Sequence, residues 1–270
     1  MGASLRLSQT LGQIALGLAL LFWGLNPSHA QPAPPRADFA DWTGFVVAGD
    51  WHAHGGAPSE VFDNGRRDIA QALSSAGFEP QNISQFSVRP GRYPTAKPLK
   101  TNLKNLSDAL RDAAPKSGGC LIYITSHGDP LGIIFGERIL TPAMLGALLD
   151  QTCGQKPTIA IVSACFSGVF VNPLARPNRM IFTAARSDRT SFGCGEADLY
   201  TYFDTCFLSQ ISEAQDFTRL ASQVRTCIAL REQATGVDLA SEPQLYLGAQ
   251  IRPLLTLLQL QMPPPRSAKP

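Results

Sequence analysis

The chain has 270 residues, a net charge of +2, and 16% charged residues. This low and balanced charge forms no basic patch, so the composition does not suggest nucleic acid as a partner. Without an N-terminal segment of 30 residues, about 240 remain, which is enough for one domain with a full hydrophobic core.

The first 30 residues have the pattern of a secretory signal peptide. Arg6 and the amino terminus supply positive charge, Leu11 to Leu25 is mostly apolar, and Ser28-His29-Ala30 ends the segment with small residues. The apolar stretch is shorter than the roughly 20 residues of a bilayer span. We expect an exported protein, periplasmic or secreted, with no stable membrane insertion after cleavage; an uncleaved anchor is the alternative. Residues 31–40 are predicted to be a Pro-rich linker.

The next segment contains one predicted strand and two predicted helices. The apolar run Phe45 to Ala48 indicates a buried strand. Ile69, Ala70 and Leu73 have helical spacing within a helix predicted over Arg66 to Ala76. A second helix is predicted over Asn102 to Ala114, where leucines recur at helical spacing.

Apolar strands alternate with helices through the rest of the chain. Strands are predicted at Leu121 to Ile124, Thr158 to Val162, Met180 to Thr183 and Gln244 to Leu247. The sequence GIIFGERIL predicts a hairpin, Thr141 caps a short helix with Pro142 in its first position, and Phe217 to Glu232 reads as a helix. This order is typical of an α/β domain, predicted over residues 41–252, with a mainly parallel sheet covered on both faces. Residues 253–270 are expected to be a C-terminal tail.

Two of the predicted strands end in reactive side chains. His127 follows the run YITS, and Cys165 follows IAIVSA. In parallel sheets, ligands bind beyond the carboxyl ends of the strands, and a thiol beside an imidazole suits nucleophilic catalysis. Taken alone, a strand-end histidine is more often structural and a lone cysteine usually belongs to core packing. The two together favour a catalytic pair.

Gly128 lies directly after the histidine. Its missing β-carbon lets the backbone come close to a ligand, so its N–H and that of Cys165 are candidates for an oxyanion hole.

Both blocks resemble the caspase-like cysteine peptidases. The wider match, with AGDW, TSHG, SACFSG, TAARSDRTSFGCG and TYFD, is similar to the legumain, or C13, family and covers Phe45 to Gly248. The resemblance implies His127 and Cys165 as the catalytic pair, with the Gly128 and Cys165 amides as the oxyanion hole. It also implies a caspase-like three-layer α/β/α sandwich around a mostly parallel sheet of about six strands.

The sequence departs from the legumains in the residues that select asparagine. Ser163 stands where the family has an acid two residues before the nucleophile, and the Arg-His pair of the loop after the first strand is absent. We therefore expect a weak or different preference for the residue before the scissile bond. Arg186 and Ser191 belong either to a surface loop or to the substrate cleft, and Asp204 lies near an acid of the family's pocket.

Three polar residues follow the first strand. His52 and His54 line the cleft or are solvated, and a metal site would require further ligands that the sequence does not place. Asp50 either orients His127 or belongs to a turn. The substrate-binding candidates are therefore Asp50, His52, Ser163, Arg186, Ser191 and Asp204, with no metal ligand.

The remaining cysteines are predicted to be mostly paired. Cys120 and Cys153 precede two nearby strands, at the amino ends away from the catalytic edge, which favours a disulfide between them. A second bridge is predicted between Cys206 and Cys227, which leaves Cys194 free.

These patterns predict a cysteine endopeptidase that acts on a peptide or protein substrate without a metal or organic cofactor. The alternatives are a transpeptidase with the same pair, a thiol hydrolase of esters or small amides, and a non-catalytic binding module. The sequence does not indicate an oligomeric state.

Overall fold

The computed structural model describes residues 38–261. The predicted signal peptide and most of the predicted linker lie outside the described residues. Within residues 38–261, no helix combines the length and the apolar character needed to cross a membrane.

The core of the domain is a seven-stranded sheet with the order β10-β9-β8-β4-β1-β2-β3. All neighbouring strands are parallel except β10, which runs antiparallel to β9. The strands are β1 (Thr43–Ala48), β2 (Ile83–Ser87), β3 (Leu99–Lys100), β4 (Cys120–Thr125), β8 (Thr158–Ser163), β9 (Arg179–Thr183) and β10 (Gln244–Leu247). The prediction of a mostly parallel sheet is confirmed, with one strand more than the family resemblance implied.

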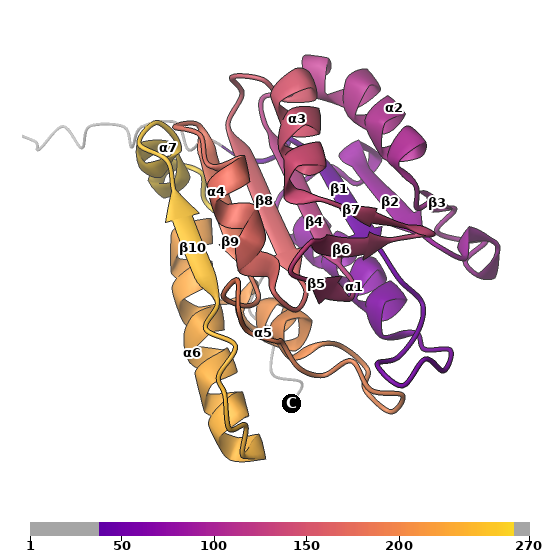
Figure 1. Cartoon of the computed structure of the whole chain (residues 1–270). Coiled ribbons are helices and arrows are strands. Elements are labelled where there is room, and N and C mark those ends of the chain that lie inside the picture. The colour runs from indigo at the N-terminus through magenta and orange to yellow at the C-terminus, as the bar shows by residue number, and fades with distance from the viewer. Residues whose placement is uncertain (1–37, 262–270) are drawn as a thin grey trace, which may run out of the picture. The chain divides into compact units, whose positions relative to one another are not determined.

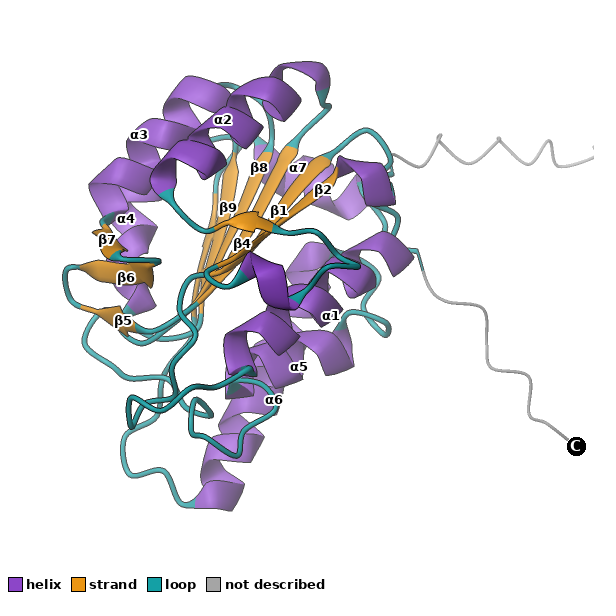
Figure 2. Cartoon of the chain, turned by 90° about the vertical axis from the view of Figure 1, so that its right-hand side faces the viewer, coloured by secondary structure: helices purple, strands orange, loops and turns teal. Residues whose placement is uncertain are grey.

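Helices cover both faces of this sheet (Figure 2). The helices are α1 (Val61–Ser75), α2 (Leu103–Ala113), α3 (Pro142–Thr152), α4 (Val171–Leu174), α5 (Tyr202–Gln210), α6 (Phe217–Thr235) and α7 (Ile251–Leu257). One core contains side chains of α1, α5, α6 and α7, and the other contains side chains of α2, α3 and α4. The structure is therefore the α/β/α sandwich that the sequence predicts.

The central strands are apolar throughout because they are buried on both faces. In β4, Leu121 and Tyr123 pack into the first core, whereas Ile122 and Ile124 pack into the second. Successive side chains of a strand point to opposite faces, so a strand covered on both sides contains no polar alternation.

The predicted cap at Thr141 is present, and Asn102 caps α2 in the same way. The side chains of Asn102 and Thr141 accept hydrogen bonds from the third residue of α2 and α3, respectively, and Pro142 begins α3. Leu103 has 36% of its surface exposed, although it follows the helical spacing of the buried Leu106 and Leu110.

A small antiparallel sheet follows His127. It consists of β5 (Gly128–Asp129), β6 (Gly132–Phe135) and β7 (Arg138–Leu140), and so contains the predicted hairpin. Ile133, Phe135 and Leu140 anchor it in the core beside α2 and α3.

The core extends beyond both predicted domain boundaries. Phe39, placed in the linker by the sequence, is fully buried against Trp42 and Phe78. The boundary at residue 252 falls inside α7, and Leu255 and Leu260 are buried. Apolar side chains on both flanks complete the core that contains α1 and α6.

Both predicted disulfides are present, Cys120–Cys153 and Cys206–Cys227. Cys120 begins β4 and Cys153 follows α3, at the end of the sheet away from His127. Among the described cysteines, Cys165 and Cys194 are free.

Candidate active site

The register of two neighbouring strands brings the reactive side chains to the same level. Thr125, the last residue of β4, pairs with Ser163, the last residue of β8. His127 and Cys165 each follow two residues later. Adjacent strands lie about 4.8 Å apart, so both side chains leave the sheet at one edge.

His127 lies in a pocket that fixes its tautomer. Its Nε2 is 3.1 Å from the carbonyl oxygen of His52. A carbonyl only accepts hydrogen bonds, so Nε2 carries the proton and Nδ1 is left as the basic nitrogen. Phe62 packs edge-on against the ring, with centroids 4.9 Å apart. Burial lowers the pKa of His127 below its ordinary value, so the ring is neutral near pH 7.

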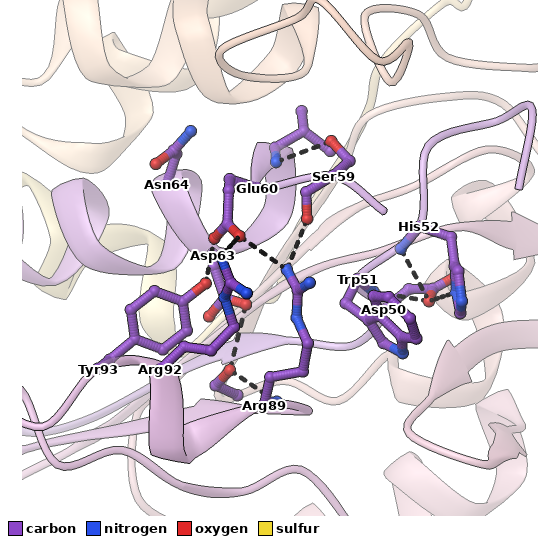
Figure 3. Close-up of polar contacts among 12 residues, drawn as sticks. Asp50, Trp51, His52, Ser59, Glu60, Asp63, Asn64, Arg89, Arg92 and Tyr93 are labelled. Atoms are coloured by element: carbon purple, nitrogen blue, oxygen red, sulfur yellow. Dashed lines mark hydrogen bonds and ion pairs between the residues drawn. The ribbon is translucent and has the colours of Figure 1, made fainter. Parts of the chain in front are cut away.

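The His52 carbonyl is held by a turn built on Asp50 (Figure 3). The Asp50 carboxylate accepts hydrogen bonds from the backbone N–H groups of Trp51 and His52, at 2.6 and 3.3 Å. It also lies 2.8 Å from Nδ1 of the His52 ring. Asp50 therefore acts on His127 through the turn and not by direct contact.

Cys165 lies at a turn that leaves its sulfur accessible. Phe166, the next residue, has a left-handed backbone with φ of 55°, and its N–H donates to the Arg189 carbonyl at 2.7 Å. The backbone N–H of Ser191 donates to the Cys165 sulfur at 3.3 Å, and the Ser191 hydroxyl lies 3.6 Å away. The Cys165 thiol can also donate to the Ser191 carbonyl oxygen at 3.4 Å, so Ser191 holds the sulfur in place.

Gly128 allows the two strand ends to approach. A β-carbon at this position would lie 2.2 Å from the Cys165 carbonyl oxygen, which no side chain permits. The glycine is required by this close contact.

One cavity of about 550 Å³ contains both reactive residues. Of the sequence-predicted residues, it brings together Asp50, His52, His127, Gly128 and Cys165. Figure 1 shows the loop after β1 and the loop before α5 below the strands, and the His54 N–H joins them by donating to the Cys194 carbonyl at 2.8 Å. The cavity is lined by Asp50, His52, Ala53, His54, Gly56, His127, Gly128, Ile134, Cys165, Phe166 and Thr190.

Comparison with known proteins agrees with this arrangement. A model described as the Peptidase C13 family matches residues 113–237, which include both strand ends. Over these residues the chain is similar to the peptidase C13 family. This similarity indicates a cysteine peptidase, a hydrolase.

The fold has a counterpart among solved structures. The crystal structure of caspase-1 from Spodoptera frugiperda matches with a TM-score of 0.57 and 13% sequence identity, over 80% of this chain and 91% of the caspase chain. This likeness supports the caspase-like fold. A search of curated protein sequences gave no match.

Two predicted substrate-binding residues lie outside the lining of the cavity. The Asp204 carboxylate is fully buried and accepts hydrogen bonds from the Tyr123 and Thr125 hydroxyls, both at 2.7 Å. Burial raises its pKa. The Ser163 hydroxyl lies 3.1 Å from that of Thr201 in the same polar cluster. Neither side chain lines the cavity in this structure.

The other two predicted residues lie in the loop after β9. Ser191 contacts the Cys165 sulfur. Arg186 is turned toward acidic partners, since its guanidinium pairs with Asp188 at 2.5 Å and Glu242 at 2.6 Å. This loop thus combines the two alternatives left by the sequence, with ion pairs at one end and contact with Cys165 at the other.

His52 and His54 do not gather further ligands. Within residues 38–261, no group of three or more His, Cys, Asp or Glu side chains is arranged to hold a metal ion. The His52 ring is instead engaged by Asp50.

Several site residues carry no signal in the sequence. Phe62 lies in α1 and reads as ordinary core, and the His52 carbonyl is a backbone atom. Thr190 stands in a polar loop with no motif of its own. The proximity of Cys194 to Cys165 also follows only from the folded chain; burial, the main cause, raises the pKa of Cys194 to about 11.

Proposed function

We propose that Cys165 and His127 form the catalytic pair of a cysteine endopeptidase. His127 Nδ1 accepts the proton of the Cys165 thiol, and the thiolate attacks the carbonyl carbon of a peptide bond. When the C–N bond breaks, His127 returns the proton to the leaving amine, and the acyl group stays on Cys165 as a thioester. Water, deprotonated by His127, then releases the acid and regenerates the thiol.

One observation carries this proposal: the strand register places a neutral, pre-oriented histidine and an accessible thiol in the same cavity. The Nε2 contact with His52 leaves Nδ1 free to act as the base. The backbone of Ser191 contacts the Cys165 sulfur and so keeps the thiol at this edge of the sheet.

The negative charge of the tetrahedral intermediate needs donors. We assign this role to the backbone N–H groups of Gly128 and Cys165. Gly128 touches the Cys165 backbone, so both amides belong to one small region of the cavity.

A labelling experiment tests the pair, with Cys194 as an internal control. A peptidyl electrophile should modify Cys165 and not Cys194, since the raised pKa of Cys194 keeps its thiol protonated. Cys165→Ala and His127→Ala should each lower kcat by at least about 1,000-fold, whereas Cys194→Ala should keep the wild-type rate. Near-normal turnover by Cys165→Ala would refute the assignment. Product masses with an added amine show whether water or an amine accepts the acyl group.

We also propose that the protein is exported. The pattern of residues 1–30 supports this, as do the two disulfides, which persist in oxidising compartments. Intact-mass analysis of the mature protein should give a chain that begins at Gln31. A chain that retains Met1 in the cytoplasm would contradict export.

A further inference from the structure

A second cavity lies beside the catalytic one and shares a wall with it. Its volume is about 740 Å³, and His52 lines both cavities. It is bounded by the turn after β1, the ends of β2 and β3, the start of α2, and the hairpin β6–β7. The catalytic mechanism uses none of these elements beyond the turn.

The shared wall is rigidly built (Figure 3). The Arg89 guanidinium stacks over the Trp51 ring at 4.7 Å. It also donates to the Ser59 carbonyl at 2.7 Å and pairs with Glu60 at 3.1 Å. A wall fixed by stacking and ion pairing offers a preformed surface to a ligand.

The lining combines apolar and basic side chains. Leu103, Ile139 and Met144 are 36%, 37% and 39% exposed, although leucine and isoleucine are usually buried. The exposed side chain of Leu103, at the start of α2, thus forms part of the wall of this cavity.

The charge of this cavity is positive. Arg89, Lys100, Lys104 and Arg138 line it, together with the acid Glu137. Arg89 is paired with Glu60 and Lys104 with Asp108 at 2.6 Å, so Lys100 and Arg138 are the cations left for a ligand. Glu137 is 88% exposed and lies 3.7 Å from Lys100, a pairing that contributes little in water. Arg138 has no acidic partner within 4 Å among the described residues. The cavity thus has positive charge available for an acidic ligand.

The sheet order gives the direction of a bound peptide. From β9 the strands run through β8, with Cys165, and β4, with His127, to β1, β2 and β3. The leaving amine takes its proton from His127, so the part of the substrate beyond the scissile bond lies on the His127 side. The second cavity is on that side. The strands that bound this cavity, β1, β2 and β3, lie one to three strand spacings from β4, or roughly 5–14 Å. An extended peptide that starts at the scissile bond reaches this distance with its second to fourth residue.

We propose that this cavity binds the leaving-group side of the substrate and selects an apolar residue next to an acidic one. The proposal rests on the catalytic pair proposed above. The apolar side chain packs among Leu103, Ile139 and Met144, and the carboxylate faces Lys100 and Arg138.

Two substrate types separate this site from the catalytic step. One is a peptidyl-coumarin amide, which has no residues beyond the scissile bond. The other is a set of internally quenched peptides with the same acyl part, in which Leu-Asp, Leu-Lys or Gly-Ser occupies either the second and third or the third and fourth leaving-group positions. We expect the wild-type kcat/KM to be highest for the Leu-Asp peptides.

Charge reversal should invert this order. Lys100→Glu with Arg138→Glu should lower kcat/KM for the Leu-Asp peptides by about tenfold and raise it for the Leu-Lys peptides. The coumarin substrate should change by less than about twofold. Arg225→Glu, an exposed reversal on α6, is the matched control and should change none of them.

A binding measurement keeps the two proposals distinguishable. Cys165→Ala protein should bind a fluorescent Leu-Asp leaving-group peptide, and the double charge reversal should weaken that binding. If the coumarin substrate falls in parallel with the peptides, or if no variant alters peptide preference or binding, the second cavity is not a substrate site. Failure of Cys165 labelling with peptide binding intact would instead overturn the catalytic pair alone.

Discussion

His127 has one polar neighbour that decides which nitrogen acts as a base. The His52 carbonyl holds the proton on Nε2, and burial against Phe62 lowers the pKa of the ring. The sequence predicts the histidine, since it ends an apolar run before a glycine. It does not predict the tautomer, because a backbone carbonyl at a turn leaves no residue-type signal.

The lowered pKa predicts the acid limb of the activity profile. The basic form of His127 persists to lower pH than an ordinary histidine, so activity is lost only as the pH falls through the lowered pKa. We expect the acid limb of kcat/KM for the peptidyl-coumarin amide to have its midpoint below 6.5. A midpoint above 6.5 would mean that pairing with the Cys165 thiolate outweighs burial.

Asp204 is expected to act on stability. Its carboxylate accepts two buried hydroxyl hydrogen bonds, and Asp204→Ala would leave both hydroxyls without this acceptor. We expect the free energy of unfolding to fall by about 2 kcal/mol in urea titrations. Asp188→Ala, an exposed control, should change it by less than about 0.5 kcal/mol. Unchanged stability with a specific loss of substrate affinity would assign Asp204 to recognition.

At the level of secondary structure, the buried elements are the predictable ones. β4 and β8 are continuous apolar runs because both of their faces are covered, and they carry His127 and Cys165. β2 and β3 were not predicted, since ISQFS is only partly buried and β3 has two residues. The second cavity is bounded in part by the ends of these two strands, so it could not be predicted from the sequence.

Gly65 shows how a helix meets the buried polar cluster. It lies inside α1, where glycine weakens a helix, but a β-carbon there would lie 2.6 Å from an Asp204 carboxylate oxygen. We expect Gly65→Ala to destabilise the protein by about 1–3 kcal/mol in thermal unfolding, despite its better helix propensity. Gly91→Ala is the control, because a β-carbon there meets no atom within 4 Å. A gain in stability for Gly65→Ala would show that α1 shifts freely.

At the level of the whole domain, each of the two disulfides cross-links residues in a different helical layer. Cys120–Cys153 lies in the core of α2 and α3, and Cys206–Cys227 joins α5 to α6. The first pairing could be predicted because both cysteines precede strands of the same sheet. The second disulfide joins two helices, α5 and α6. Since α5 shows no periodic signal in the sequence, the positions of strands and helices offered no argument for this pairing.

Removing either bridge should cost stability without affecting catalysis. The bridges close loops of 33 and 21 residues, so replacing either pair by alanine should lower the free energy of unfolding by about 3 kcal/mol. Turnover at low temperature should stay near the wild-type rate, since Cys120 begins β4 at the end opposite His127. Equal urea midpoints for the wild type and both double variants would contradict this expectation.

The sulfur atoms differ in access as well as in role. Cys165 is partly exposed and lines an open cavity, whereas Cys120, Cys153 and Cys206 are at most 2% exposed. Thiol–disulfide exchange requires contact with the attacking thiolate, so a small reductant reaches an oxidised adduct on Cys165 before it reaches the Cys120–Cys153 bridge, whereas Cys227 of the second bridge is only partly buried. A graded thiol titration should therefore restore activity first and lower the melting temperature only at higher concentrations. An oxidised Cys165 can therefore be reduced to the active thiol while the Cys120–Cys153 disulfide stays intact.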